Sequence, residues 1–101
     1  MLDFTYIDDL VDGICLATQH PAARNQIFNM TYGKGRSIAE LVTIMQQDFP
    51  EVMVEYVERD ELMPVRGTLS IDKAVRLLGY SPNNPLEVGF PKYIDWYKGV
   101  V

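Results

Sequence analysis

The feature that most restricts the fold of this sequence is a short helix with a defined end near residue 79. Apolar side chains recur at helical spacing over residues 72–78, and Ser70 or Asp72 can cap the start of the helix. Gly79 suits a left-handed helix end because it has no side chain that would clash in that conformation. We therefore predict a helix over residues 72–78 that ends at Gly79.

A second helix is predicted after Ser37. The run Ser37-Ile-Ala-Glu40 matches a capping box, in which the serine and the glutamate each satisfy a backbone amide of the other. Apolar residues then recur at helical spacing as far as Met45. The sequence therefore predicts an amphipathic helix that starts directly after Ser37.

Helices are also predicted near both ends of the chain. Acidic residues 8–9 favour a helix start, and the helix should end near His20, because a residue that precedes a proline is biased out of the helical region. Apolar side chains over residues 86–97 predict a terminal helix. Pro85 suits the first turn of this helix, whereas Pro91 should kink it or shorten its start.

Three short runs are typical of strands. They are rich in apolar and β-prone residues, and they span residues 4–7, 26–30 and 52–57. With 101 residues and 48% hydrophobic residues, the chain is expected to form one domain over residues 1–101. The predicted fold class is α/β, a small mixed module in which short strands alternate with about four helices.

Composition excludes several kinds of partner. Nine basic against fourteen acidic residues give a net charge of -5, and no basic cluster interleaves with aromatic residues, so nucleic acid is not an expected partner. No apolar run reaches membrane-spanning length, no signal peptide opens the sequence, and the single cysteine excludes an internal disulfide. We expect a cytoplasmic protein. An anionic ligand would need a local basic pocket, for which the candidates are Arg24, Lys34, Arg36, Arg59 and Arg66.

The glycines at 33 and 35 imitate part of a dinucleotide-binding loop. They follow a predicted strand and precede a helix, but Ile38 stands where the third glycine of that fingerprint should allow close packing. A turn between a strand and a helix is the preferred interpretation. Backbone amides near Ser37 could hold an anion weakly, which leaves a nucleotide loop as a third hypothesis.

Other candidate groups favour structural roles. Cys15 and His20 have no third group to orient the imidazole, so we expect a buried cysteine and a histidine cation at a helix end. One His and one Cys do not make a metal site. Asp8, Asp9 and Asp12 should cap a helix and face solvent. The aromatic residues of the terminal helix could form a stacking surface, but Tyr93 and Tyr97 are expected in the core, with Trp96 nearer the rim.

Three segments of the chain, taken in order, resemble the extended short-chain dehydrogenase/reductase family. They are the runs Asp3-Phe-Thr-Tyr-Ile-Asp-Asp-Leu, Phe28-Asn-Met-Thr-x-Gly-x-Gly-x-Ser-Ile and Ser70-x-Asp-Lys-Ala-x-x-x-Leu-Gly-Tyr-x-Pro. This family contains the NAD-dependent nucleotide-sugar epimerases and dehydratases, including UDP-glucose 4-epimerase-like enzymes. Within it, such segments belong to the C-terminal part, which binds the nucleoside-diphosphate sugar.

The resemblance implies a part of an enzyme without its chemistry. In the family, NAD and a catalytic Tyr-x-x-x-Lys pair come from an N-terminal Rossmann portion, and no Tyr here is followed four residues later by Lys. No catalytic, cofactor-binding or metal-binding residue is therefore assigned, and NAD is expected only in a full-length parent. Arg59 is the nearest match to the family's diphosphate-binding arginine, and Arg66 is a second possibility. The ribose-binding aspartate has no counterpart.

Two functions follow as hypotheses. The first is the nucleotide-sugar-binding part of an epimerase or dehydratase, which is inactive alone and binds its sugar nucleotide weakly or not at all. The alternative is a stand-alone interaction or scaffold module derived from that lobe. In the first case an exposed former domain interface would favour self-association, whereas in the alternative the same surface would bind another protein.

Overall fold

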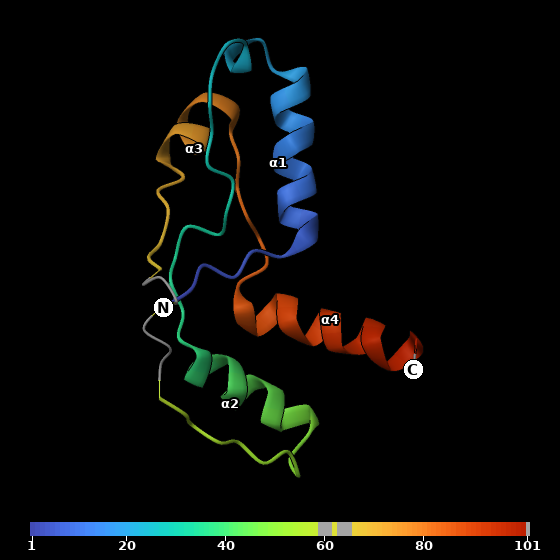
Figure 1. Ribbon diagram of the computed structural model, residues 1–101. Helices are drawn as coiled ribbons and strands as arrows, with labels where there is room; N and C mark the ends of the chain where they lie inside the picture. Colours follow the sequence, from blue (N-terminus) through green and yellow to red (C-terminus); the bar gives the residue numbers. More distant parts are fainter. Residues whose placement is uncertain (59–61, 63–65, 101) are drawn as a thin grey trace.

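The computed structural model describes residues 1–58, 62 and 66–100, and these residues form four α-helices. Helices α1 (Ile7–Gln19) and α3 (Asp72–Leu78) pack together, and the 3-10 turn η1 (Pro21–Ala23) also contacts α3. Helices α2 (Ile38–Asp48) and α4 (Leu86–Val100) form a second pair. Figure 1 shows α1 and α3 at one end of the molecule and α2 and α4 at the other.

The prediction of a mixed α/β fold is wrong. The described residues contain no strand and no sheet, only an isolated antiparallel bridge between Leu2 and Arg36. A β-prone run becomes a strand only where another strand takes up its backbone groups. Within the described part of the chain, residues 52–57 are exposed and pair with no strand, and residues 4–7 and 26–30 are also outside any ladder.

Near the N-terminus, side-chain hydrogen bonds join two segments in place of the backbone hydrogen bonds of a sheet. The Asp3 carboxylate accepts hydrogen bonds from the Thr31 hydroxyl at 2.7 Å and from the Gly33 amide at 3.2 Å. The Thr5 hydroxyl accepts one from the Tyr32 amide at 3.3 Å. Segment 3–5 is therefore held against segment 31–33 by side chains, and Gly33 has the positive φ of 87° that its place in the turn requires.

The helix boundaries confirm most of the local predictions. The capping box of α2 is complete, because the Glu40 amide donates to Ser37 Oγ at 3.1 Å and the Ser37 amide donates to Glu40 Oε2 at 2.8 Å. Helix α1 ends before His20, and α3 ends at Gly79, whose φ is 69°. Helix α4 continues through Pro91, so the proline does not shorten its start.

Side chains also bond to backbone amides at the start of α3 and at the start of η1. The residue before α3 is Ile71, which makes no capping bond, and Ser70 Oγ instead accepts the Asp72 amide at 3.3 Å. His20 Nδ1 accepts a hydrogen bond from the Ala22 amide at 3.1 Å. His20 therefore caps the 3-10 turn with its ring, at the end of α1 where it was expected.

A buried carboxylate joins the two halves of the molecule. Asp9, in the first turn of α1, is only 2% exposed, so the prediction that it faces solvent is wrong. Its oxygens accept hydrogen bonds from the amides of Asn83 and Asn84, both at 2.9 Å, and from the side-chain amide of Asn84 at 3.0 Å. These three bonds hold the segment between α3 and α4 against the start of α1.

Tyr80 is the largest buried side chain near α1. Its hydroxyl donates to the carbonyl of Thr31 at 2.8 Å, and its ring lies against Gly13 of α1. A Cβ at Gly13 would be 3.0 Å from the Tyr80 ring and 2.7 Å from the sulfur of Met30. The glycine therefore allows close packing. Burial, followed by the nearby carboxylates of Asp9, Asp3 and Asp12, raises the pKa of Tyr80 above its usual value.

The molecule is flat and open for its length. It measures 50 × 37 × 19 Å, and its radius of gyration is 16.3 Å, against about 13 Å expected for a compact domain of this length. Its accessible surface is 7690 Å², whereas a compact protein of this mass exposes about 5,800 Å². The core is correspondingly small, and its buried apolar residues are Ile44, Ala74, Leu78, Tyr80, Leu86 and Ile94.

Replacement of Asp9 tests the connection between the two halves. Asp9→Asn removes the charge and turns one acceptor oxygen into a donor, so it should lower the free energy of unfolding by about 2 kcal/mol. Asp8→Asn is the matched control, because Asp8 is exposed in the same first turn and loses the same interaction with the helix dipole. Urea denaturation should give a clearly larger loss for Asp9→Asn. Equal losses would contradict the role of the buried bonds.

Replacement of Tyr80 tests the contact between the end of α3 and residue 31. Tyr80→Phe keeps the ring but leaves the Thr31 carbonyl without its donor, so it should lower the free energy of unfolding by about 1 kcal/mol. Tyr97→Phe makes the same change at an exposed position and should stay within about 0.5 kcal/mol of the parent. Thermal or urea denaturation measures both, and a neutral Tyr80→Phe variant would disprove the contact.

Candidate functional site

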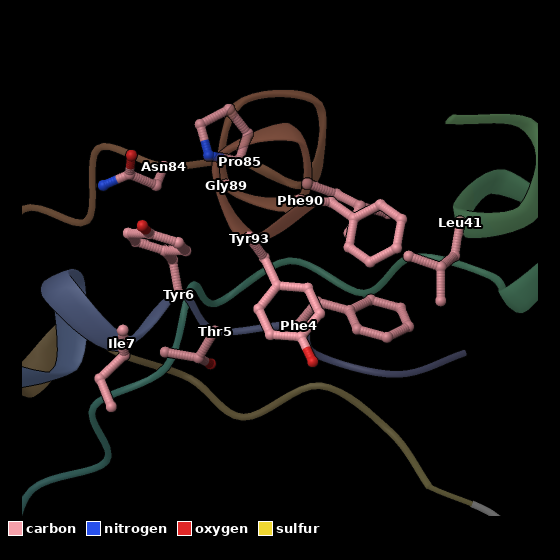
Figure 2. A pocket seen from close by; sticks show the side chains of 11 residues that line it. Phe4, Thr5, Tyr6, Ile7, Leu41, Asn84, Pro85, Gly89, Phe90 and Tyr93 are labelled. Carbon is pink, nitrogen blue, oxygen red and sulfur yellow. The ribbon is translucent and has the colours of Figure 1, made fainter. Parts of the chain in front are cut away.

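An apolar groove lies between the N-terminal segment and α4. Its volume is about 470 Å³, a size typical of small-ligand sites. It lies where the chain between Phe4 and Ile7 faces α4 and one side of α2 (Figure 2). Its walls are Phe4, Thr5, Tyr6, Ile7, Leu41, Asn84, Pro85, Leu86, Gly89, Phe90 and Tyr93.

A glycine lets the wall formed by α4 approach the N-terminal segment. A Cβ at Gly89 would lie 3.0 Å from Cδ1 of Tyr6 and 3.2 Å from its Cβ, both closer than ordinary side-chain contacts. Figure 2 shows Tyr6 next to Gly89 and Pro85 in the groove. This close approach requires the absence of a side chain at Gly89.

The polar end of the groove is held by Asp9. Asn84 donates to the Asp9 carboxylate, and its own Oδ1 accepts a hydrogen bond from Lys92 Nζ at 2.6 Å. The same ammonium lies 5.5 Å from the centre of the Tyr6 ring. Lys92 is thus already engaged by an amide and an aromatic face. The groove suits an apolar or aromatic group better than a diphosphate.

Aromatic side chains continue from the groove along α4. Phe90 stacks on Tyr93 with ring centres 6.2 Å apart, and Tyr93 stacks on Trp96 at 5.9 Å. Tyr93, Trp96 and Tyr97 are all exposed, so the prediction that Tyr93 and Tyr97 are core residues is wrong. The alternative prediction, that aromatic residues of the terminal helix form a stacking surface, is confirmed.

Ion pairs hold α2 and α4 parallel beside the groove. Arg36 binds Glu40 at 3.1 Å and also contacts the carboxylate of Glu87, at the start of α4. At the other end, Lys98 lies 3.6 Å from Asp48 and 5.2 Å from the centre of the Phe49 ring. The starts of the two helices are thus joined to each other, and so are their ends.

The ion pairs of Arg36 help to lower the pKa values of two carboxylates. The hydrogen bond from Arg36, followed by a backbone hydrogen bond, lowers the pKa of Glu87 from 4.5 to about 2. The backbone hydrogen bond of Ser37, followed by the bond from Arg36, lowers the pKa of Glu40. Both carboxylates are stabilised in their charged form by folding, so both favour the folded state above pH 4.5.

The structure describes one of the two arginines predicted to bind substrate. Arg66 is exposed in the segment that leads into α3, and it is not among the groove walls. Arg59 lies outside the described residues. The role of both arginines stays a prediction.

The other candidate groups are distributed over the surface. Cys15 is exposed, so the prediction of a buried cysteine is wrong. Within residues 1–58, 62 and 66–100, no three His, Cys, Asp or Glu side chains gather as a metal site would need. In the glycine loop, the amides of Gly33 and Ser37 are bonded to Asp3 and Glu40. No helix in the described part of the chain has the length and apolar character needed to cross a bilayer.

Sequence comparison relates the chain to nucleotide-sugar epimerases. It is 30% identical to UDP-glucuronate 4-epimerases 4 and 3 of Arabidopsis thaliana, over 113 and 115 residues that cover 94% and 96% of this chain. An uncharacterized protein of Methanocaldococcus jannaschii is 26% identical over 96 residues, which cover 94% of this chain and 29% of that protein. No family model matches the chain. No solved structure matches it either.

The similarity covers nearly all of this chain but a small part of its relatives. The aligned regions make up 25% and 26% of the two plant enzymes, so the chain spans about a quarter of their length. The chain is therefore homologous to a part of UDP-glucuronate 4-epimerases, which confirms the resemblance to nucleotide-sugar epimerases at that level.

Acid titration tests the pair of Arg36 and Glu87. The pKa of Glu87 is lower in the folded chain than in the unfolded chain, so its contribution to stability is complete above pH 4.5 and disappears as the pH falls towards 2. Glu87→Gln should destabilise the chain at pH 7, and this difference from the parent should shrink between pH 4.5 and 2. Urea denaturation at several pH values measures it.

Glu51→Gln is the control for this titration, because Glu51 is exposed in the segment after α2. Its effect on stability should be small across the same range of pH. A deficit of Glu87→Gln that stays constant down to pH 2 would show that the ion pair does not cause the effect.

Proposed function

We propose that this chain is the C-terminal, nucleotide-sugar-binding part of an NAD-dependent nucleotide-sugar epimerase and has no catalytic activity alone. The observation that carries the proposal is homology over 94% of the chain to a quarter of a UDP-glucuronate 4-epimerase. The missing Tyr-x-x-x-Lys pair supports the lack of activity. NAD and the proton-transfer groups would come from the rest of the parent enzyme, in the cytoplasm.

The ligand is a UDP-sugar, and UDP-glucuronate is the first to test, since it is the sugar nucleotide in the names of the plant relatives. A diphosphate is best bound by cationic donors, and none of the described walls of the groove is cationic. Lys92, beside the groove, is engaged by Asn84 and Tyr6. The diphosphate is therefore assigned to Arg59 or Arg66, of which Arg66 lies in the described part of the chain. Arg66 is exposed and so accessible to a ligand.

An activity assay tests the lack of catalysis. The purified chain, supplied with UDP-glucuronate or UDP-glucose and NAD, should form no 4-epimer detectable by NMR or chromatography. A full-length UDP-glucuronate 4-epimerase of Arabidopsis thaliana provides the positive control. Epimerisation by the purified chain above the enzyme-free rate would refute the proposal.

A binding experiment tests the role of Arg66. Chemical shift changes in the labelled chain, followed at millimolar UDP-glucuronate, should give an affinity that Arg66→Ala weakens by about tenfold or more, because an arginine bond to phosphate is a charge-assisted contact. Arg76→Ala is the matched control, since Arg76 is also exposed, in the last turn of α3. Equal effects of the two variants would exclude a specific contact from Arg66.

The second candidate function is a stand-alone interaction or scaffold module. The large accessible surface of the chain and its many exposed apolar residues favour it. The same titration separates the two functions. A response that depends on Arg66 would favour the sugar-nucleotide site over the interaction module.

A further inference from the structure

Helix α4 carries an apolar stripe that no described part of the chain covers. The stripe consists of Tyr93, Trp96, Tyr97 and Val100, which are 51%, 62%, 47% and 65% exposed. The spacing of these residues, i, i+3, i+4 and i+7, places them on one face of the helix. Ile94 of the same helix is 3% exposed, and α4 packs along α2. Helix α4 thus buries apolar side chains on one side and exposes an apolar stripe on another.

The stripe continues directly into the groove. Phe90 and Tyr93 are groove walls, and they stack in series with Trp96 of the stripe. Figure 2 shows Phe90 and Tyr93 facing Phe4 across the groove. Because the rings already stack on one another, less side-chain freedom is lost when a partner covers them.

The geometry points to a second copy of this chain as the partner: we propose that two copies pair through α4, each inserting Trp96 into the groove of the other. In a symmetric pair both copies use the same surface patch. The inserted side chain and the groove that receives it must therefore lie on one face of α4, on opposite sides of the twofold axis that relates the two copies. Trp96 lies three residues after Tyr93, and Phe90 lies three residues before Tyr93. At a rise of 1.5 Å per residue, each is displaced from Tyr93 by about 4.5 Å along the helix axis. Antiparallel α4 helices with the axis at Tyr93 therefore bring each Trp96 opposite the other copy's Phe90.

The available area is sufficient for such a pair. Three aromatic side chains that bury 150–250 Å² each when covered, here about half exposed, supply on the order of 300 Å² per copy. Val100 and the groove walls raise this to about 500 Å², so two copies reach the roughly 1,000 Å² that a specific interface needs. The groove, at about 470 Å³, is large enough to receive one aromatic side chain.

The inference does not depend on the proposed function. It uses the groove and the stripe, whereas the sugar nucleotide is assigned to Arg59 or Arg66, and Arg66 is not a groove wall. A failure of the pair would leave the binding experiment with UDP-glucuronate unchanged, and a failure of that experiment would leave the pair unchanged.

The single tryptophan gives a direct test. Trp96 is the only Trp in the chain, so its fluorescence reports the interface alone. On dilution of the full chain, its emission should shift to longer wavelengths, while light scattering shows the mass falling from two chains to one. Tyr93→Ala should weaken association by about tenfold or more, the size expected for a central aromatic residue of an interface.

Tyr56→Ala is the matched control, because Tyr56 is 74% exposed and lies in the apolar segment 52–57, away from α4. It should leave the association constant unchanged. Val100→Lys repeats the test at the end of the helix, where a charge cannot disturb the core, and should also weaken the pair. The proposal is overturned if the parent stays monomeric at millimolar concentration, if it forms open-ended assemblies, or if only Tyr56→Ala prevents association.

Discussion

The buried carboxylate of Asp9 is the contact on which the arrangement of the helices depends. It belongs to α1, but all three of its hydrogen bonds go to Asn83 and Asn84, in the segment that leads into α4. A buried charge is tolerated only when donors surround it, and here backbone and side-chain amides do so. The bonds set where α4 begins, and the groove between α4 and the segment 4–7 follows from that position.

Features fixed by neighbouring residues could be predicted, and features fixed by distant ones could not. The capping box at Ser37, the helix end before Pro21 and the left-handed Gly79 depend on a few adjacent residues, and all three were predicted. The three predicted strands are absent from the described residues, because a strand also needs a partner strand. Segment 52–57 has the composition of a strand, but it is exposed and pairs with no other strand among the described residues.

The candidate site shows the same division. Asp9 was expected to face solvent, since acidic residues at a helix start usually do, and nothing adjacent in the sequence indicates that Asn84 covers it. The groove joins segments 4–7, Leu41 and 84–93, so its signal is distributed over the chain. Sequence motifs were more informative about ancestry, because the resemblance to nucleotide-sugar epimerases agrees with the similarity to the plant enzymes. Arg59 and Arg66 remain predictions.

The open shape and the exposed stripe indicate that few internal contacts position the helices. The hydrogen bonds of Asp9 are the most important of these contacts. Hydrogen exchange of the Asn83 and Asn84 amides tests this most directly, since both donate to the buried carboxylate at 2.9 Å although they lie between helices. The account predicts that they exchange as slowly as the amides of α1. Exchange as fast as that of the exposed amides of residues 53–57 would contradict it.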